Sequence, residues 1–321
     1  MSSRLKLMIT CVAGLTLLAV MALPALAQFG SATITIGLVA YALGLRHAFD
    51  ADHIAAIDNV TRRLRQAGQR PVAVGFFFSL GHSTVVMALI LGLALAFRNV
   101  HAEIQRLTEW GALVSDIGSA IVLTLIGLAN FAVFRRLLRT GSAKREVAQS
   151  LENAPSAQSR IAQLWSTVNT SWKMYPVGML FGLGFDTATE VALLAISVGA
   201  LQSGQFPLWV VMLFPLLFAA GMCLMDTVQS LLMLRMYDWA IIDGNSSLKL
   251  NTLVTGLSVI MALGVACVKW ASLTGLLVQS GRISDLAGSS ELGLAASGVM
   301  AALWLAAYLY RRWTRPSAMQ L

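Results

Sequence analysis

The segment 46–53, Arg-His-Ala-Phe-Asp-Ala-Asp-His, holds two histidines and two aspartates within seven residues and follows an apolar run over 29–45. Imidazole nitrogens and carboxylate oxygens together form the ligand set of borderline divalent transition metals. If the segment is helical, successive residues turn by about 100°, so His47, Asp50 and His53 cover an arc of roughly 120° while Asp52 points elsewhere. Three such groups on one helix face could chelate a metal ion.

The alternative for this segment is a cytosolic loop. A span that ends at Leu45 would leave Arg46 as a basic anchor and the acids as ordinary solvated charges. The apolar residues 54–57, and a basic run that begins only at Arg62, favour a position within or at the edge of the membrane. A charge there costs about 2.5–3.5 kcal/mol on insertion scales, so the cluster indicates a function.

Three further apolar runs carry isolated polar side chains. His82 lies among hydroxyl and aromatic residues at 76–84, Asp186 and Glu190 are spaced i,i+4 as on one helix face, and Asp226 interrupts an apolar stretch. Taken singly, such a histidine can be a structural hydrogen-bonding residue, and the glycines at 178 and 182 could form a packing seam.

Depth in the membrane relates these residues to the first segment. A rise of 1.5 Å per residue places all of them between the midplane and the cytoplasmic third of the bilayer. We expect them to share a polar cavity that attracts a cation, with no lysine or arginine inside the spans except Arg46.

The composition requires a membrane to hold these elements. The chain of 321 residues is 57% hydrophobic and 12% charged, with a mean hydropathy of +0.73, which is far outside the range of soluble domains. The excess of 23 Lys+Arg over 15 Asp+Glu falls in loops, as the positive-inside rule requires, so we expect no nucleic-acid partner. The three cysteines lie in apolar runs without a disulfide or zinc spacing.

The apolar runs predict an all-α, polytopic transmembrane bundle of about eight spans. They cover approximately 7–27, 30–57, 72–97, 112–134, 174–200, 207–234, 250–278 and 288–310. Basic residues at 58–71, at 135–173 and in the tail predict that both termini are cytoplasmic. The first run ends in Ala-Leu-Ala at 25–27, which resembles a signal-peptidase site, but its length favours a retained helix, and both fates stay open.

The longest loop divides the chain. We expect a first membrane half over 1–134, a cytoplasmic linker over 135–173 and a second membrane half over 174–321. Spans two to four and five to seven could be inverted repeats, with polar motifs on the first two helices of each, although no clear residue-level repeat is visible.

These motifs together resemble those of a known family. Segment 46–54 is similar to the His-x4-Asp-His hallmark of the nickel/cobalt transporter family of single-component permeases. Segments 80–86, 183–190 and 221–227 resemble the second, third and fourth motifs of that family, in the same order.

The resemblance implies an eight-span permease of the inner membrane that takes up Ni²⁺ and/or Co²⁺ without an ATPase subunit, a cofactor or a catalytic reaction. It implies that five residues are metal-transport residues, namely His47, Asp50, Asp52, His53 and His82, and that three candidate metal residues lie in supporting motifs, namely Asp186, Glu190 and Asp226. Gln229 departs from the family pattern, which has a second acid there, and this puts the rate or ion preference in doubt.

Two other functions would use the same residue types. Efflux of nickel or cobalt is one, and the lack of a long histidine-rich loop weighs only mildly against it. A membrane metalloenzyme is the other, but three intramembrane histidines on two helices come without an obvious nucleophile or cofactor motif. We expect uptake driven by the membrane potential or an ion gradient, with the metal ion and the lipid bilayer as partners.

Overall fold

The computed structural model describes residues 3–96, 101–139, 168–183, 187–242 and 247–274, together with the single residues 298 and 302. Every element in these ranges is helical, and no strand occurs among them, which confirms the all-α fold class. The elements are α1 (Ser3–Ala27), α2 (Ser31–His47), α3 (Ala51–Gln66), α4 (Val74–Ala96), α5 (His101–Arg139), the 3-10 turn η1 (Ser171–Lys173), α8 (Met174–Phe181), α9 (Ala188–Gln202), α10 (Leu208–Ile242) and α11 (Ser247–Leu273).

Five of these helices are long and apolar enough to cross a membrane, and the bent pair α2–α3 makes a sixth candidate. The five are α1, α4, α5, α10 and α11. The run over 288–310 lies outside the described residues, so the count of eight spans stays a prediction, as does the division at the 135–173 linker. Two helices extend past the expected spans, since α5 begins at His101 and α10 continues to Ile242.

The expected continuous helix over 30–57 is wrong, because the chain breaks at residues 48–50. The α2 helix ends at His47, and Asp50 has the extended backbone of an N-cap with φ −65° and ψ 141°. The chain then turns by 53° into α3. The Asp50 carboxylate makes no cap hydrogen bond to α3 and faces His47 instead, while Asp52 in the first turn suits the positive end of the helix dipole.

The expected helix over 174–200 is also broken. The first part, α8, ends at Phe181, and α9 begins after the extended residue Thr187. Thr187 and Glu190 form a capping box, in which the Thr187 hydroxyl accepts from the Glu190 N–H and the Glu190 carboxylate accepts from the Thr187 N–H. This pair fixes the start of α9.

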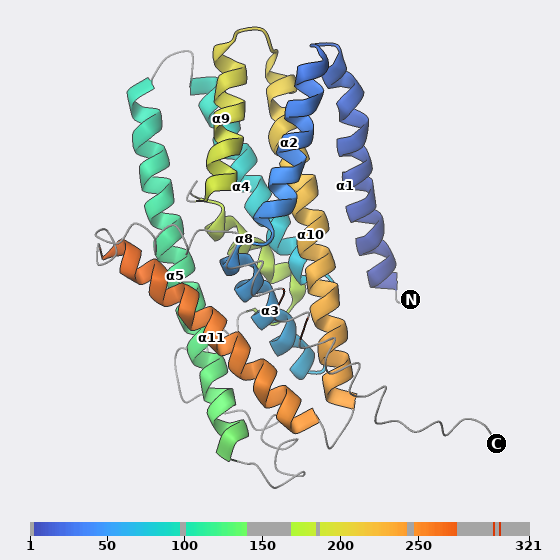
Figure 1. Cartoon of the computed structure of the whole chain (residues 1–321), viewed down its shortest axis with the longest axis vertical. Coiled ribbons are helices and arrows are strands. Elements are labelled where there is room, and N and C mark those ends of the chain that lie inside the picture. The colour runs from blue at the N-terminus through green and yellow to red at the C-terminus, as the bar shows by residue number, and fades with distance from the viewer. Residues whose placement is uncertain are drawn as a thin grey trace, which may run out of the picture.

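The helices pack as a bundle in which α10 touches α2, α3 and α4, while α5 lies along α11 (Figure 1). The contact between α2 and α10 is close at two glycines. A Cβ on Gly44 would overlap the carbonyl of Phe218, and a Cβ on Gly221 would overlap the carbonyl of Tyr41. The pattern is therefore Tyr-x2-Gly on α2 against Phe-x2-Gly on α10.

The contact between α8 and α4 repeats this pattern. A Cβ on Gly178 would overlap the Phe78 carbonyl, and a Cβ on Gly81 would overlap the Tyr175 carbonyl. The same contact thus joins α2 to α10 and α8 to α4, and the division into two inverted halves stays a prediction.

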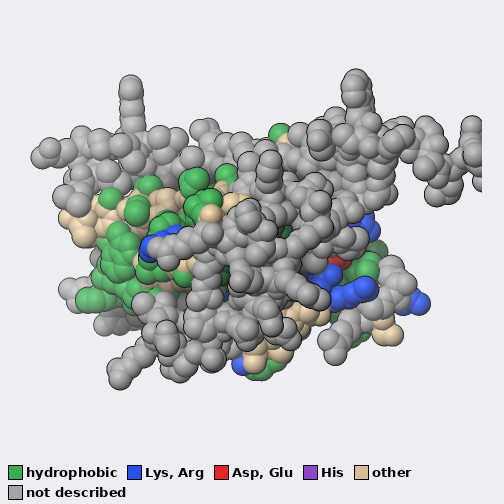
Figure 2. Space-filling view, turned by 90° about the horizontal axis from the view of Figure 1, so that it is seen from below, with side chains coloured by type: hydrophobic (Ala, Val, Ile, Leu, Met, Phe, Trp, Pro, Cys, Tyr) green, Lys and Arg blue, Asp and Glu red, His purple; other side chains and the backbone are tan. Residues whose placement is uncertain are grey.

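One end of the bundle carries basic residues. The last turn of α3 holds Arg63 and Arg65, and Arg65 pairs with Asp238 near the end of α10. Seen from this end, Lys and Arg side chains lie among apolar ones on the described surface (Figure 2). The positive-inside rule would place this end in the cytoplasm.

Candidate metal-binding site

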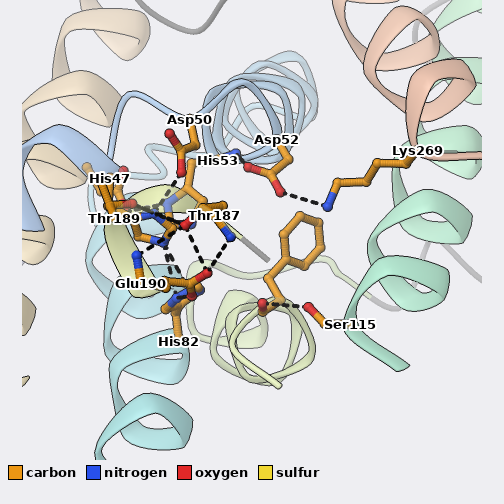
Figure 3. A network of polar contacts seen from close by, with 12 residues as sticks. His47, Asp50, Asp52, His53, His82, Ser115, Thr187, Thr189, Glu190 and Lys269 are labelled. Atoms are coloured by element: carbon orange, nitrogen blue, oxygen red, sulfur yellow. Dashed lines mark hydrogen bonds and ion pairs between the residues drawn. The ribbon is translucent and has the colours of Figure 1, made fainter. Parts of the chain in front are cut away.

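Three buried histidines meet inside the bundle, next to the two helix breaks (Figure 3). His47 is the last residue of α2, His53 lies in the first turn of α3, and His82 is in α4. Their side chains are at most 2% exposed, and each offers a nitrogen such that these three atoms lie within 4.8 Å of one another. This is a group that could hold a metal ion.

The tightest part of the site joins three elements. The Nε2 atoms of His47 and His82 are 3.2 Å apart, and Glu190 Oε1 lies 2.9 Å from His82 Nε2 and 3.7 Å from His47 Nε2. For metal–nitrogen bonds of about 2.1 Å, neighbouring ligand atoms in tetrahedral or octahedral geometry are roughly 3.0–3.4 Å apart. The two edges at His82 are close to this range, the 3.7 Å edge between Glu190 and His47 is longer, and the Glu190 corner is held by the cap of α9.

The other ring nitrogen of His47 faces oxygen atoms. Its Nδ1 lies 2.7 Å from Asp50 Oδ2, 3.0 Å from Thr189 Oγ1 and 3.3 Å from Thr187 Oγ1. A carboxylate behind the imidazole fixes the ring orientation and increases the basicity of the other nitrogen, which faces His82. The break at residues 48–50 places Asp50 where it can do this.

His53 has its own acidic partner. Its Nδ1 lies 3.3 Å from Asp226 Oδ2 on α10, which also accepts a hydrogen bond of 2.5 Å from the Ser79 hydroxyl. The His53 ring stands edge-on to Phe78, with centroids 4.8 Å apart. Asp226 itself is fully buried, so its charge acts in a region shielded from water.

Asp52 lies beside this group, on α3, and its carboxylate faces Lys269. Its Oδ2 is 3.3 Å from the Lys269 ammonium on α11 (Figure 3), and Lys269 is also 3.2 Å from Asp116 on α5. The expectation that the spans hold no basic residue except Arg46 is therefore wrong. Lys269 stands in the apolar run over 250–278, where the sequence could have revealed it.

The third motif is placed only in part. Asp186 lies outside the described residues. Glu190 lies in the first turn of α9, which begins at Ala188, and the expectation that both acids share one helix face stays a prediction. Gln229, where the resemblance leads to the expectation of an acid, is 7% exposed on α10, and neither of its side-chain polar atoms has a hydrogen-bond partner within the described part of the chain.

A second buried polar group escaped the sequence reasoning. Asp58 accepts hydrogen bonds from Tyr237 of α10 and, at 2.6 Å, from Ser258 of α11. Arg62, which is 1% exposed, donates to Thr255 at 2.8 Å. The sequence signal was an acid and an arginine four residues apart, shortly after the histidine motif. The structure shows that this part of α3 is almost completely buried. This group ties α3 to α10 and α11.

Comparison with known proteins adds independent information. The profile of the NicO family, described as high-affinity nickel-transport protein, matches residues 33–310. The nickel transporter NicT of Mycobacterium tuberculosis is 41% identical, with 88% of this chain and 81% of NicT covered. The cobalt transport protein NhlF of Rhodococcus rhodochrous is 40% identical, with coverage of 85% and 82%.

A third relative has a similar relationship. The high-affinity nickel transport protein of Cupriavidus necator is 38% identical, with 91% of this chain and 87% of that protein covered. No solved structure matches the chain.

Proposed function

The chain belongs to the NicO family of high-affinity nickel-transport proteins, and from this premise we propose that it takes up Ni²⁺ and/or Co²⁺ as a single-component permease. The family and these relatives are transporters, so we assign no catalytic reaction and no resident cofactor. The metal ion is the substrate. One relative is named for nickel and another for cobalt, so either ion is a substrate candidate.

The observation that carries this proposal is the convergence of three buried histidines, each with an acidic group near its ring. Asp50 backs His47, Glu190 contacts His82, and Asp226 contacts His53. Neutral imidazoles supply ligands, and the carboxylates supply the charge that a divalent ion needs on leaving water. Glu190 can complete the ligand set with an oxygen atom, while Asp50 orients His47 from behind the ring.

The donor set also bears on selectivity. Imidazole nitrogens favour Ni²⁺ and Co²⁺ over Mg²⁺ and Ca²⁺, which prefer oxygen ligands. Cu²⁺ ranks above both in the Irving–Williams order, so discrimination against copper must come from geometry and metal availability. The two helix breaks determine that geometry because they set the positions of His47, Asp50 and Glu190.

The driving force can come from the membrane potential. An inside-negative potential of 100 mV favours the inward movement of a divalent ion by about 4.6 kcal/mol, at about 2.3 kcal/mol per charge. This corresponds to roughly 10³-fold accumulation. We place the protein in the inner membrane with both termini in the cytoplasm, supported by the basic loops and by Arg63 and Arg65 at one end of the bundle.

The test is uptake of trace radioactive Ni²⁺ and Co²⁺ into cells that express the chain, beside a His47→Ala variant at equal abundance. We expect accumulation in the first and its loss in the second, with mutual competition revealing the preferred ion. Unchanged uptake by His47→Ala at normal abundance would refute the ligand assignment. Faster loss of metal from preloaded cells would instead indicate efflux.

A further inference from the structure

A group of three charged residues lies next to the histidines and touches them through one backbone hydrogen bond, from the His53 N–H to Asp52. Lys269 of α11 places its ammonium 3.3 Å from Asp52 Oδ2 of α3 and 3.2 Å from Asp116 Oδ1 of α5. Three helices thus meet at one cation. The side chains are 10%, 13% and 32% exposed for Lys269, Asp52 and Asp116, whereas the three histidines are almost completely buried.

Asp52 links this group to the histidine cluster. Its second oxygen, Oδ1, accepts a hydrogen bond of 2.9 Å from the backbone N–H of His53. The His53 side chain in turn contacts Asp226 and Phe78. The ion pair with Lys269 therefore helps to position the first turn of α3, which carries one of the three histidines.

A lysine in this place needs an explanation. It lies inside Thr255–Leu273, an apolar window long enough to span a membrane, where a charge is costly unless it is paired. A single paired acid would satisfy that requirement, yet Lys269 has two, from two different helices. Two carboxylates that converge on one cation are also a ligand pair suited to a hard divalent ion such as Mg²⁺.

We propose that Lys269 is a tethered cation that fills an oxygen-only site between Asp52 and Asp116, and so excludes hard divalent ions from the approach to the histidines. This inference rests on the proposed function, because it assigns Lys269 as a specificity-determining residue for metal uptake. The histidines select by nitrogen ligands, and Lys269 removes the neighbouring oxygen site that would otherwise collect Mg²⁺. Because the Lys269 ammonium is covalently attached to the chain, it cannot dissociate from the two carboxylates as a bound ion could.

The experiment compares Mg²⁺ inhibition of trace Ni²⁺ uptake in proteoliposomes of the purified full-length chain and of Lys269→Gln, normalised to transporter in the membrane. The variant leaves two acids without their ammonium. We expect Mg²⁺ to inhibit it at a concentration at least about tenfold lower, because the affinity of oxygen-ligand sites follows their charge count. Equal Mg²⁺ sensitivity of the two proteins would overturn the inference.

Three variants separate this role from general effects. Lys269→Arg keeps the charge and should behave like the original chain, so a gain of Mg²⁺ sensitivity in it counts against the inference. The double variant Lys269→Gln with Asp116→Asn lacks one carboxylate and should lose the added sensitivity. Lys6→Gln removes an exposed lysine of α1 and should change nothing.

A second measurement does not depend on transport. Binding of Mn²⁺ alone to the detergent-purified proteins, followed by electron paramagnetic resonance, should show one more bound ion in Lys269→Gln than in the original chain. An equal stoichiometry would overturn the inference even at low variant abundance. If the original chain takes up no Ni²⁺ at all, the proposed function fails, and the Mn²⁺ stoichiometry still decides whether the second site exists.

Discussion

Replacing Glu190 by glutamine tests whether its charge serves the metal ion. Glu190 Oε1 contacts ring nitrogens of both His82 and His47, at 2.9 and 3.7 Å, and the residue is fully buried. Loss of a single outer-shell partner of a metal ligand costs about 10- to 100-fold in metal affinity. Because Glu190 is close to two histidines and can itself supply a ligand oxygen, we expect a loss near the 100-fold end of that range, which is about 2.7 kcal/mol.

The glutamine keeps the shape and the cap that Glu190 provides. Its side-chain oxygen can still accept from the Thr187 N–H, so the start of α9 should persist. Thr187→Val serves as a comparison, because it removes the Thr187 half of the capping box, worth about 1 kcal/mol, together with the 3.3 Å contact to His47 Nδ1, without changing any charge.

The assay is the concentration dependence of radioactive Ni²⁺ uptake, normalised to transporter abundance. We expect Glu190→Gln to raise the apparent KM strongly and to leave membrane abundance nearly unchanged. An unchanged KM would refute the electrostatic reasoning. A loss of abundance equal to that of Thr187→Val would show that Glu190 acts only through the cap.

Two further predictions concern α10 and its contacts. Gly44→Ala would force a methyl group onto the Phe218 carbonyl, so we expect a loss of stability of about 1–3 kcal/mol, seen as lower membrane abundance. The control Gly92→Ala should be tolerated, because no atom lies within 4 Å of its new Cβ. Equal abundance of the two variants would contradict the close packing of α2 on α10. Gln229→Asp adds a buried charge one helical turn from Asp226, so we expect a lower KM or a shifted Ni²⁺/Co²⁺ preference in competition assays. Unchanged transport would mean that residue 229 does not face the ion path.

The sequence allowed much of the fold to be predicted because hydropathy reflects the free energy of transferring side chains from water into lipid. The all-α class follows from hydropathy alone, since only a helix forms the backbone hydrogen bonds of such an apolar span within the span itself. The grouping of His47, His82 and Asp226 could also be predicted, because residue counting along spans of known direction gives depth. These arguments use one helix at a time.

What could not be predicted depends on contacts between helices. The break before Asp50 depends on α3 being surrounded by α10, α11, α4 and α5, which bury a helix that is too polar to be recognised as a span. The pairing of Lys269 with Asp52 joins residues more than 200 positions apart. The reciprocal glycine contacts involve three-residue spacings that are too common to identify without knowing which helices touch.

The two breaks explain how a cation site can exist where helix ends meet. A helix N-terminus carries about half a positive charge, which favours anions, and both α3 and α9 begin near the histidines. Each carries an acid in its first turn, Asp52 in α3 and Glu190 in α9, which offsets that charge. The end of α2 at His47 adds the negative end of a third helix dipole. The acids of the motifs therefore have two electrostatic tasks, since they must first neutralise the helix ends and then hold a divalent ion, and this accounts for a site with three histidines but at least four nearby carboxylates.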